Sequence, residues 1–192
     1  MSAPGLTCQD LTVTVPGRTL VAGLELEVRT GSFLGILGRN GSGKTTTLHT
    51  LCGLRPQQNS RVFLDGKPIG EWPRKQIATR IGFVTQHLED PFPTSVLETV
   101  MAGRHPHLDF WRWESADDRR LAREALARME LGGLEKRAVD TLSGGERRRL
   151  EIAMLLCQDT PTCLLDEPTN HLDPAHEKAV LLLLRKLAAT PR

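Results

Sequence analysis

The sequence predicts an α/β fold that combines a parallel core sheet, an antiparallel β part at the amino end and a helical insertion. Apolar and polar residues alternate through residues 6–30, with a turn at Pro16-Gly17, as is typical of half-buried antiparallel strands. Three short apolar runs follow, and each is typical of a strand buried on both faces of a parallel sheet. These runs are residues 33–37, 81–84 and 162–165.

Helical patterns and one hairpin connect these apolar runs. The hairpin is expected over residues 61–69, with its turn at Asp65-Gly66. The segment between the second and third runs is dense in charge and helical in pattern, so we assign residues 88–140 to an inserted helical part. Residues 1–87 and 141–192 then form the α/β core with its β part. Helices are expected over residues 45–54, 115–129, 146–157 and 174–189.

The composition excludes several classes of protein. The 192 residues carry a net charge of +2 and are 39% hydrophobic, so we expect an ordinary globular domain with no nucleic-acid partner. No apolar run approaches the roughly 20 residues of a membrane-spanning helix, and the amino end lacks the pattern of a signal peptide. A cytoplasmic protein is therefore expected. The four cysteines are expected to be buried small hydrophobes: Cys8, Cys52, Cys157 and Cys163.

Residues 38–45 carry the strongest chemical signal. The segment Gly38-Arg39-Asn40-Gly41-Ser42-Gly43-Lys44-Thr45 has the pattern GxxxxGK[ST] and lies between an apolar run and a helical pattern. Its glycines let backbone N–H groups converge, and the following helix adds its positive end, so the loop can bind a polyphosphate. We expect Lys44 at the β- and γ-phosphates, Thr46 at the nucleotide and the Thr45 hydroxyl at Mg²⁺. The alternative is a glycine-rich turn without a ligand.

A pair of carboxylates follows the apolar run 162–165. Asp166 and Glu167 are adjacent, and because successive strand residues point in opposite directions, they can serve different roles. We expect Asp166 to bind Mg²⁺ and Glu167 to orient the attacking water at the γ-phosphate. Taken alone, the pair is equally typical of an ordinary acidic strand end.

Two further segments take their meaning from these motifs. Leu142-Ser143-Gly144-Gly145-Glu146 opens a helix with Ser143 as its N-cap, and the same segment is typical of a second phosphate-binding helix start. Because it is distant in sequence from Lys44, a nucleotide site completed by a second copy of the chain is the natural arrangement. Gln86 follows the run 81–84, where it can contact Mg²⁺ or the attacking water. By itself it is a generic surface residue.

The order of these motifs resembles the ATP-binding subunit of ABC transporters. The motifs are GRNGSGKT at 38–45, Gln86, LSGGE at 142–146, CLLDEP at 163–168 and HLD at 171–173. The resemblance covers about residues 6–187 and implies a P-loop ATPase with a RecA-like core. It also implies a head-to-tail homodimer that holds two ATP. In such a dimer Ser143, Gly144 and Gly145 contact the γ-phosphate bound by the partner chain, and Asp173 communicates across the interface.

A finer resemblance concerns the transported substrate. The segments 169–173 and 103–107 resemble ATPases that serve iron–siderophore, haem or cobalamin importers. That resemblance implies a polytopic membrane permease on which residues 88–140 dock at the inner face of the cell membrane, and a separate substrate-binding protein. The alternatives are an exporter ATPase, a non-transport ABC ATPase of DNA repair or ribosomes, and a remnant that binds nucleotide without turnover.

The sequence departs from the family pattern at two places that matter. Val15 stands where the family usually has an aromatic residue against adenine, and the chain has no Tyr, so we expect ATP binding with appreciable tolerance of GTP. The family also has a later strand that ends in a histidine at the γ-phosphate, whereas this sequence stops at Arg192. We therefore expect truncated C-terminal strands, an open sheet edge and impaired hydrolysis. Glu146 and Arg39, where many members have Gln and Pro, are expected to be neutral.

Overall fold

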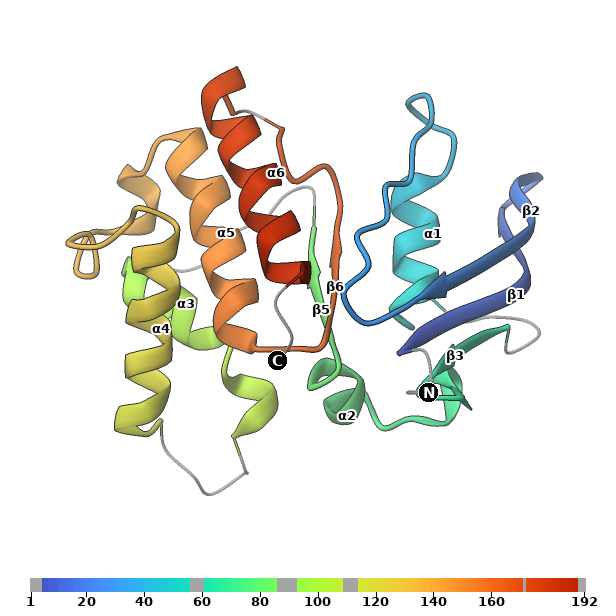
Figure 1. The fold of residues 1–192 in the computed structure, drawn as a ribbon, viewed down its shortest axis with the longest axis horizontal. Helices are drawn as coiled ribbons and strands as arrows, with labels where there is room; N and C mark the ends of the chain where they lie inside the picture. The colour runs from blue at the N-terminus through green and yellow to red at the C-terminus, as the bar shows by residue number, and fades with distance from the viewer. Residues whose placement is uncertain (1–4, 56–60, 86–92, 109–113, 171, 190–192) are drawn as a thin grey trace.

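The computed structural model describes residues 5–55, 61–85, 93–108, 114–170 and 172–189. The strands are β1 (Leu6–Val15), β2 (Arg18–Val28), β3 (Val62–Leu64), β4 (Lys67–Pro68), β5 (Ile81–Val84) and β6 (Thr162–Leu165). The α-helices are α1 (Lys44–Leu51), α2 (Arg74–Ala78), α3 (Val96–Ala102), α4 (Ala116–Arg128), α5 (Gly144–Gln158) and α6 (Pro174–Ala189). Figure 1 shows α3, α4, α5 and α6 on one side, α1 with β1, β2 and β3 on the other, and β5 and β6 between them.

The antiparallel sheet confirms the predicted amino-terminal strands. Its order is β2-β1-β3-β4, and the hairpin of β1 and β2 closes where Val15 pairs with Arg18. Alternate β1 residues are fully buried against the helix α1 side, as the alternating pattern requires. The β3–β4 turn falls at Asp65 and Gly66, whose φ angles are 50° and 78°. Both residues therefore have the left-handed backbone that a tight hairpin turn demands.

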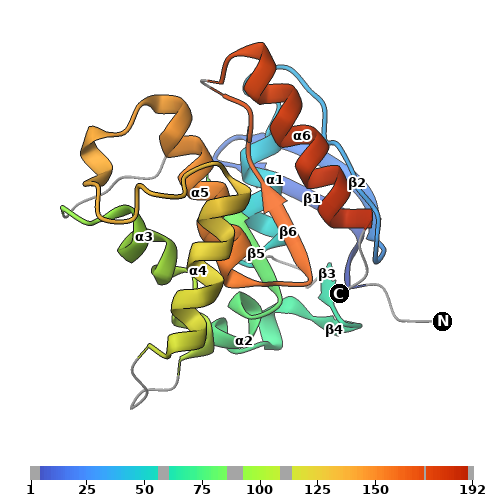
Figure 2. The same cartoon turned by 60° about the vertical axis from the view of Figure 1, so that its left-hand side comes forward.

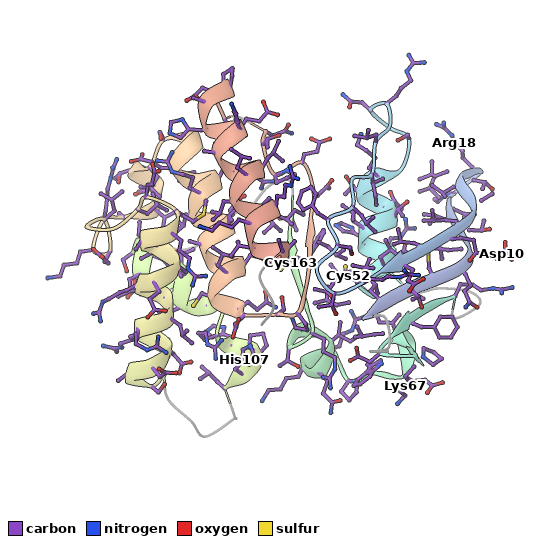
Figure 3. All side chains as sticks on the ribbon, in the orientation of Figure 1. Asp10, Arg18, Cys52, Lys67, His107 and Cys163 are labelled. Carbon is purple, nitrogen blue, oxygen red and sulfur yellow. The ribbon has the colours of Figure 1, made fainter. Side chains whose placement is uncertain are left out.

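The parallel pair β5–β6 confirms two of the three predicted core strands. Ile81 pairs with Thr162, and Val84 pairs with Leu165. The expectation that β6 is buried on both faces is wrong, because its side chains alternate between buried and exposed. Cys163 is exposed for this reason, so the expectation of a buried cysteine is wrong there, while the other three cysteines are buried and no two of the four form a disulfide (Figure 3 shows Cys52 and Cys163). Burial raises the pKa of the thiols of Cys8 and Cys157 to about 11.

The third predicted core strand, residues 33–37, is not a strand in the structure. Phe33 and Leu34 are each 51% exposed and Leu37 is 95% exposed. A strand forms only when neighbouring segments satisfy its backbone groups, and among the described residues none pairs with residues 33–37. Figure 2 shows α6 passing β6 towards the end of β2, and the Ala188 carbonyl lies near Gly31. Apolar composition alone therefore did not decide the conformation of residues 33–37.

The helical side of the molecule confirms the helix starts predicted at Ser115 and Ser143, and it adds one at Ser95 that the sequence did not predict. Ser95, Ser115 and Ser143 each cap a helix, and each cap is a reciprocal capping box with the acidic residue three positions later. Buried apolar residues of α3, α4, α5 and α6 share one core, while β1, β3 and α1 share another. The boundary of the helical part at residues 88–140 stays a prediction. Among the described residues, no helix is long and apolar enough to cross a membrane.

A buried ion pair holds the helical core together. Arg104 Nε donates to Asp118 Oδ1 at 2.9 Å, and Arg104 Nη1 donates to the Cys157 carbonyl at 3.0 Å. Hydrogen bonds from Ser115, with help from Arg104, hold the pKa of Asp118 at about 2, below its usual 3.8. These contacts link α3, α4 and the end of α5.

Candidate nucleotide site

The glycine-rich loop has the backbone that the sequence predicts. Gly41 and Gly43 have φ angles of 76° and 98°, which only glycine adopts without strain. At Gly43 a Cβ atom would lie 2.9 Å from Leu20 Cβ, so the loop also packs closely against β2. Helix α1 begins at Lys44, directly after the loop. The loop-to-helix half of the predicted setting is confirmed, whereas the strand expected before the loop is absent.

Lys44 lies across the loop that precedes it. Its Nζ donates to the carbonyls of Gly38 at 3.0 Å and Arg39 at 3.3 Å. The same Nζ lies 4.0 Å from Glu167 Oε1. The fold thus brings together two predicted site residues that are far apart in the sequence. An ion pair at this distance contributes little to stability. It is informative because it places the Lys44 ammonium, next to the glycine-rich loop, close to the Glu167 carboxylate.

Asp166 and Glu167 occupy different environments, as their adjacency predicts. Asp166 is 2% exposed, and its Oδ2 has no hydrogen-bond partner among the residues that the structure describes. Glu167 is half-buried, has a left-handed φ of 47°, and accepts hydrogen bonds from the side-chain amide of Asn170 at Oε2 and from the Asn170 N–H at its carbonyl. A buried, unpartnered carboxylate oxygen is a hard donor of the kind that Mg²⁺ prefers, so Asp166 fits the predicted cation.

No sequence motif singles out Arg148, whose side chain binds the backbone that carries these carboxylates. Its side chain is 5% exposed and donates to the carbonyls of Thr85, Asp166, Glu167 and Pro168. Only helical periodicity could have singled it out among three consecutive arginines, because position 148 falls on the buried face of α5.

The loop 142–146 is held in an open, accessible conformation at the start of α5. Ser143 Oγ accepts from the Glu146 N–H at 3.2 Å, and Glu146 Oε2 accepts from the Ser143 N–H at 2.8 Å. Hydrogen bonds from Ser143, with Arg137 nearby, hold the pKa of Glu146 below its usual value. Ser143 and Gly144 are exposed, while Leu142 is buried. The start of α5 is therefore exposed at Ser143 and Gly144.

Asp173 shares a cleft with this loop. It accepts from the N–H groups of Ala175 and His176, each at 3.0 Å, and these hydrogen bonds, together with the His176 ring, lower its pKa. The cleft has a volume of about 480 Å³, and no residue of 38–46 lines it. The lining residues are Ser143, Gly145, Glu146, Arg149, Leu172, Asp173 and His176. The glycine-rich loop therefore does not line the same cleft as the loop 142–146, and a site shared between two chains stays a prediction.

Two predicted site residues remain outside this geometry. Val15 is half-buried at the end of β1, beside the strand whose Leu20 contacts the glycine-rich loop. Gln86 lies outside the described residues. Of the other loop residues, Thr45 and Thr46 are half-buried on the first turn of α1, and Asn40 is exposed.

Comparisons with known proteins agree with this geometry. The ABC transporter family matches residues 21–170. The ferric enterobactin transport ATP-binding protein FepC of Escherichia coli K12 is 39% identical, over 97% of this chain and 69% of its own length. The hemin import ATP-binding protein HmuV of Streptomyces coelicolor is 38% identical, over 97% of this chain and 67% of its own.

One solved structure bears on the assembly. The ATP-binding cassette MJ0796, determined as a dimer in a post-hydrolysis state with ADP and Pi, superposes with a TM-score of 0.79 at 26% identity. The match covers 95% of this chain and 82% of that one. Three observations lead to one conclusion. The family matches most of the chain, the relatives are well above 30% identical, and Lys44 of the glycine-rich loop lies close to Glu167. The chain belongs to the ABC transporter family, as an ATP-binding ATPase subunit.

Proposed function

We propose that this chain energises an importer of an iron–siderophore, haem or cobalamin-type substrate. The catalytic part of this proposal rests on the 4.0 Å distance between Lys44 Nζ and Glu167 Oε1, next to Asp166, whose Oδ2 has no hydrogen-bond partner among the described residues. The printed names of FepC and HmuV, which are a ferric enterobactin and a hemin import ATP-binding protein, support the substrate class. The exporter and non-transport alternatives have no comparable support.

The site residues have different roles in ATP binding and hydrolysis. The N–H groups of the glycine-rich loop, with Thr46 behind them, bind the phosphates, and Lys44 turns from the loop carbonyls to the β- and γ-phosphates. Thr45, Asp166 and Gln86 hold Mg²⁺, which supplies positive charge next to the phosphates when bound. Glu167, held by Asn170, accepts a hydrogen bond from the attacking water and orients it. Val15 contacts the base.

A second copy of the chain completes each site. The exposed Ser143 and Gly144, with Gly145, point a helix start at the γ-phosphate held by the partner, and Asp173 carries the state of one site to the other. The dimeric state of MJ0796 supports this arrangement. We further propose that residues 88–140 dock on a membrane permease at the inner face of the membrane, and that a separate binding protein supplies the substrate.

Three experiments test this function. ATP hydrolysis is measured for the wild type, Lys44→Ala and Glu167→Gln. We expect loss of ATP binding in the first variant, and retained binding with loss of hydrolysis in the second. Light scattering should show an ATP-dependent dimer in Glu167→Gln that Ser143→Arg abolishes. Uptake of ferric siderophore, hemin and cobalamin is then compared in proteoliposomes that contain the cognate permease. Equal hydrolysis by the wild type and Glu167→Gln contradicts the catalytic assignment, and uptake of none of the three contradicts the substrate class.

A further inference from the structure

We propose that Arg148 is a positioning residue that sets the orientation of Glu167 and ties it to α5, the helix that carries the loop 142–146. This inference rests on the proposed role of Glu167 in hydrolysis. Arg148 touches neither the glycine-rich loop nor the exposed part of the loop 142–146 in the described contacts. It acts through the backbone on which Glu167 stands.

All three guanidinium nitrogens of Arg148 are engaged. Nη2 donates to the carbonyls of Asp166 at 2.6 Å and Glu167 at 2.7 Å. Nε donates to the Pro168 carbonyl at 3.1 Å, and Nη1 donates to the Thr85 carbonyl at 2.9 Å and also to the carboxylate of Glu151. Three consecutive carbonyls after β6 are therefore held by one planar group that is itself 5% exposed.

The turn that Arg148 binds has an unfavourable backbone conformation at Glu167. Glu167 has a φ of 47°, a left-handed backbone that a residue with a side chain adopts only when its surroundings impose it. The Arg148 fork binds the carbonyls on both sides of that φ angle, those of Asp166 and Glu167. Because the side-chain direction of Glu167 follows from its backbone, the fork fixes where the carboxylate points. A lysine offers one nitrogen with three donors and cannot span the same carbonyls in a fixed plane.

The same side chain joins three elements that the proposed mechanism uses. Arg148 belongs to α5, which begins at Gly144 within the loop 142–146. Thr85 directly precedes Gln86 in the sequence. The Asp166 N–H also donates to the Val84 carbonyl at 3.0 Å, which joins β5 to the same turn. Any displacement of α5 relative to β6 must stretch several of these hydrogen bonds. If contact between Ser143 and the partner's nucleotide displaces α5, the backbone of Glu167 in the same chain therefore shifts as well.

The first test separates positioning from stability. Arg148→Lys and Arg148→Gln are compared with Arg104→Gln, which breaks another buried arginine network that ends at Asp118 and the Cys157 carbonyl. Melting temperature, affinity for ATP and the single-turnover rate at saturating Mg·ATP are measured. Both Arg148 variants should keep an affinity within about threefold and lose on the order of 10- to 100-fold in rate, because small misplacements of reacting groups have effects of this size. Arg104→Gln should lower the melting temperature and keep the rate within about threefold.

Two outcomes overturn the proposal. One is an unchanged rate in both Arg148 variants. The other is a loss of rate in Arg104→Gln that equals theirs at the same loss of melting temperature, because Arg148 is then a structural residue only.

A second measurement is independent of turnover. Hydrogen exchange is followed in the nucleotide-free protein for the wild type, Arg148→Lys and Arg104→Gln. Arg148→Lys should speed exchange at residues 81–85 and 166–170 together, while Arg104→Gln should speed it around α4 and the end of α5. A uniform increase in exchange rate across the chain, or no increase at these two segments, refutes the proposed link between Arg148 and the Glu167 turn. If the wild type neither binds nor hydrolyses ATP, the proposed function fails, and this measurement still decides on Arg148.

Discussion

Asp166→Asn tests whether the buried Asp166 carboxylate, which we assign to Mg²⁺, lowers the stability of the nucleotide-free protein. Asp166 is 2% exposed, and within the described part of the chain its Oδ2 has no hydrogen-bond partner. A buried polar group left unsatisfied costs about 1–3 kcal/mol, and more when it is charged. Asparagine keeps the shape and one unpaired group but removes the charge. We therefore expect the free energy of unfolding of the nucleotide-free protein to rise by about 1 kcal/mol, which corresponds to a melting temperature higher by roughly 2–4 °C for a chain of this size.

The same variant should respond differently to the nucleotide. With Mg·ATP at about 100 times its Kd, the wild type gains about 2.7 kcal/mol, because only the folded state binds the ligand. Asp166→Asn lacks one oxygen donor for Mg²⁺ and should gain much less, while its response to ATP in EDTA should match that of the wild type. The two proteins should therefore exchange their order of stability when Mg·ATP is added. Thermal and urea unfolding, each with and without Mg·ATP, measure this exchange.

The control for Asp166→Asn is Asp117→Asn, an exposed carboxylate on α4 paired with Arg120. It should change neither the stability nor the response to Mg·ATP by more than about 0.5 kcal/mol. The reasoning is refuted if Asp166→Asn is less stable than the wild type without nucleotide, since the carboxylate then contributes to the fold. A full Mg·ATP response in Asp166→Asn would falsify its assignment to the cation.

Three further predictions concern other parts of the chain. Ser143→Ala should lower the free energy of unfolding by about 1 kcal/mol in urea titrations, because it removes the N-cap of α5; no change contradicts the cap. The pKa of Asp118 is about 2 in the folded state against 3.8 ordinarily, so its contribution is complete above pH 4 and is lost as the pH falls through that range. Acid unfolding followed by circular dichroism should therefore be less steep in Asp118→Asn, and an identical profile counts against it. Val15→Tyr should increase the preference for ATP over GTP in competition assays by restoring an aromatic face, and an existing strong ATP preference in the wild type contradicts the role of Val15.

Local elements could be predicted from the sequence because the interactions that define them span only a few residues. The caps at Ser115 and Ser143 join a side chain to an N–H three positions later, and the turn at Asp65-Gly66 depends on two φ angles. Residues 33–37 show the limit of this reasoning. Their apolar pattern is compatible with a buried strand, yet a strand depends on partners elsewhere in the chain, and none among the described residues pairs with them.

The family of this chain can be predicted from the sequence because its motifs are local. The loop of pattern GxxxxGK[ST], the Asp-Glu pair after a strand and the LSGGE helix start each consist of adjacent residues, and their order is sufficient to predict the ABC family. Which of these groups meet depends on the tertiary structure. Lys44 Nζ lies 4.0 Å from Glu167 Oε1, and Arg148 on α5, which packs against β5, donates to the Glu167 carbonyl. No local pattern encodes such a contact, since it depends on the packing of the whole core.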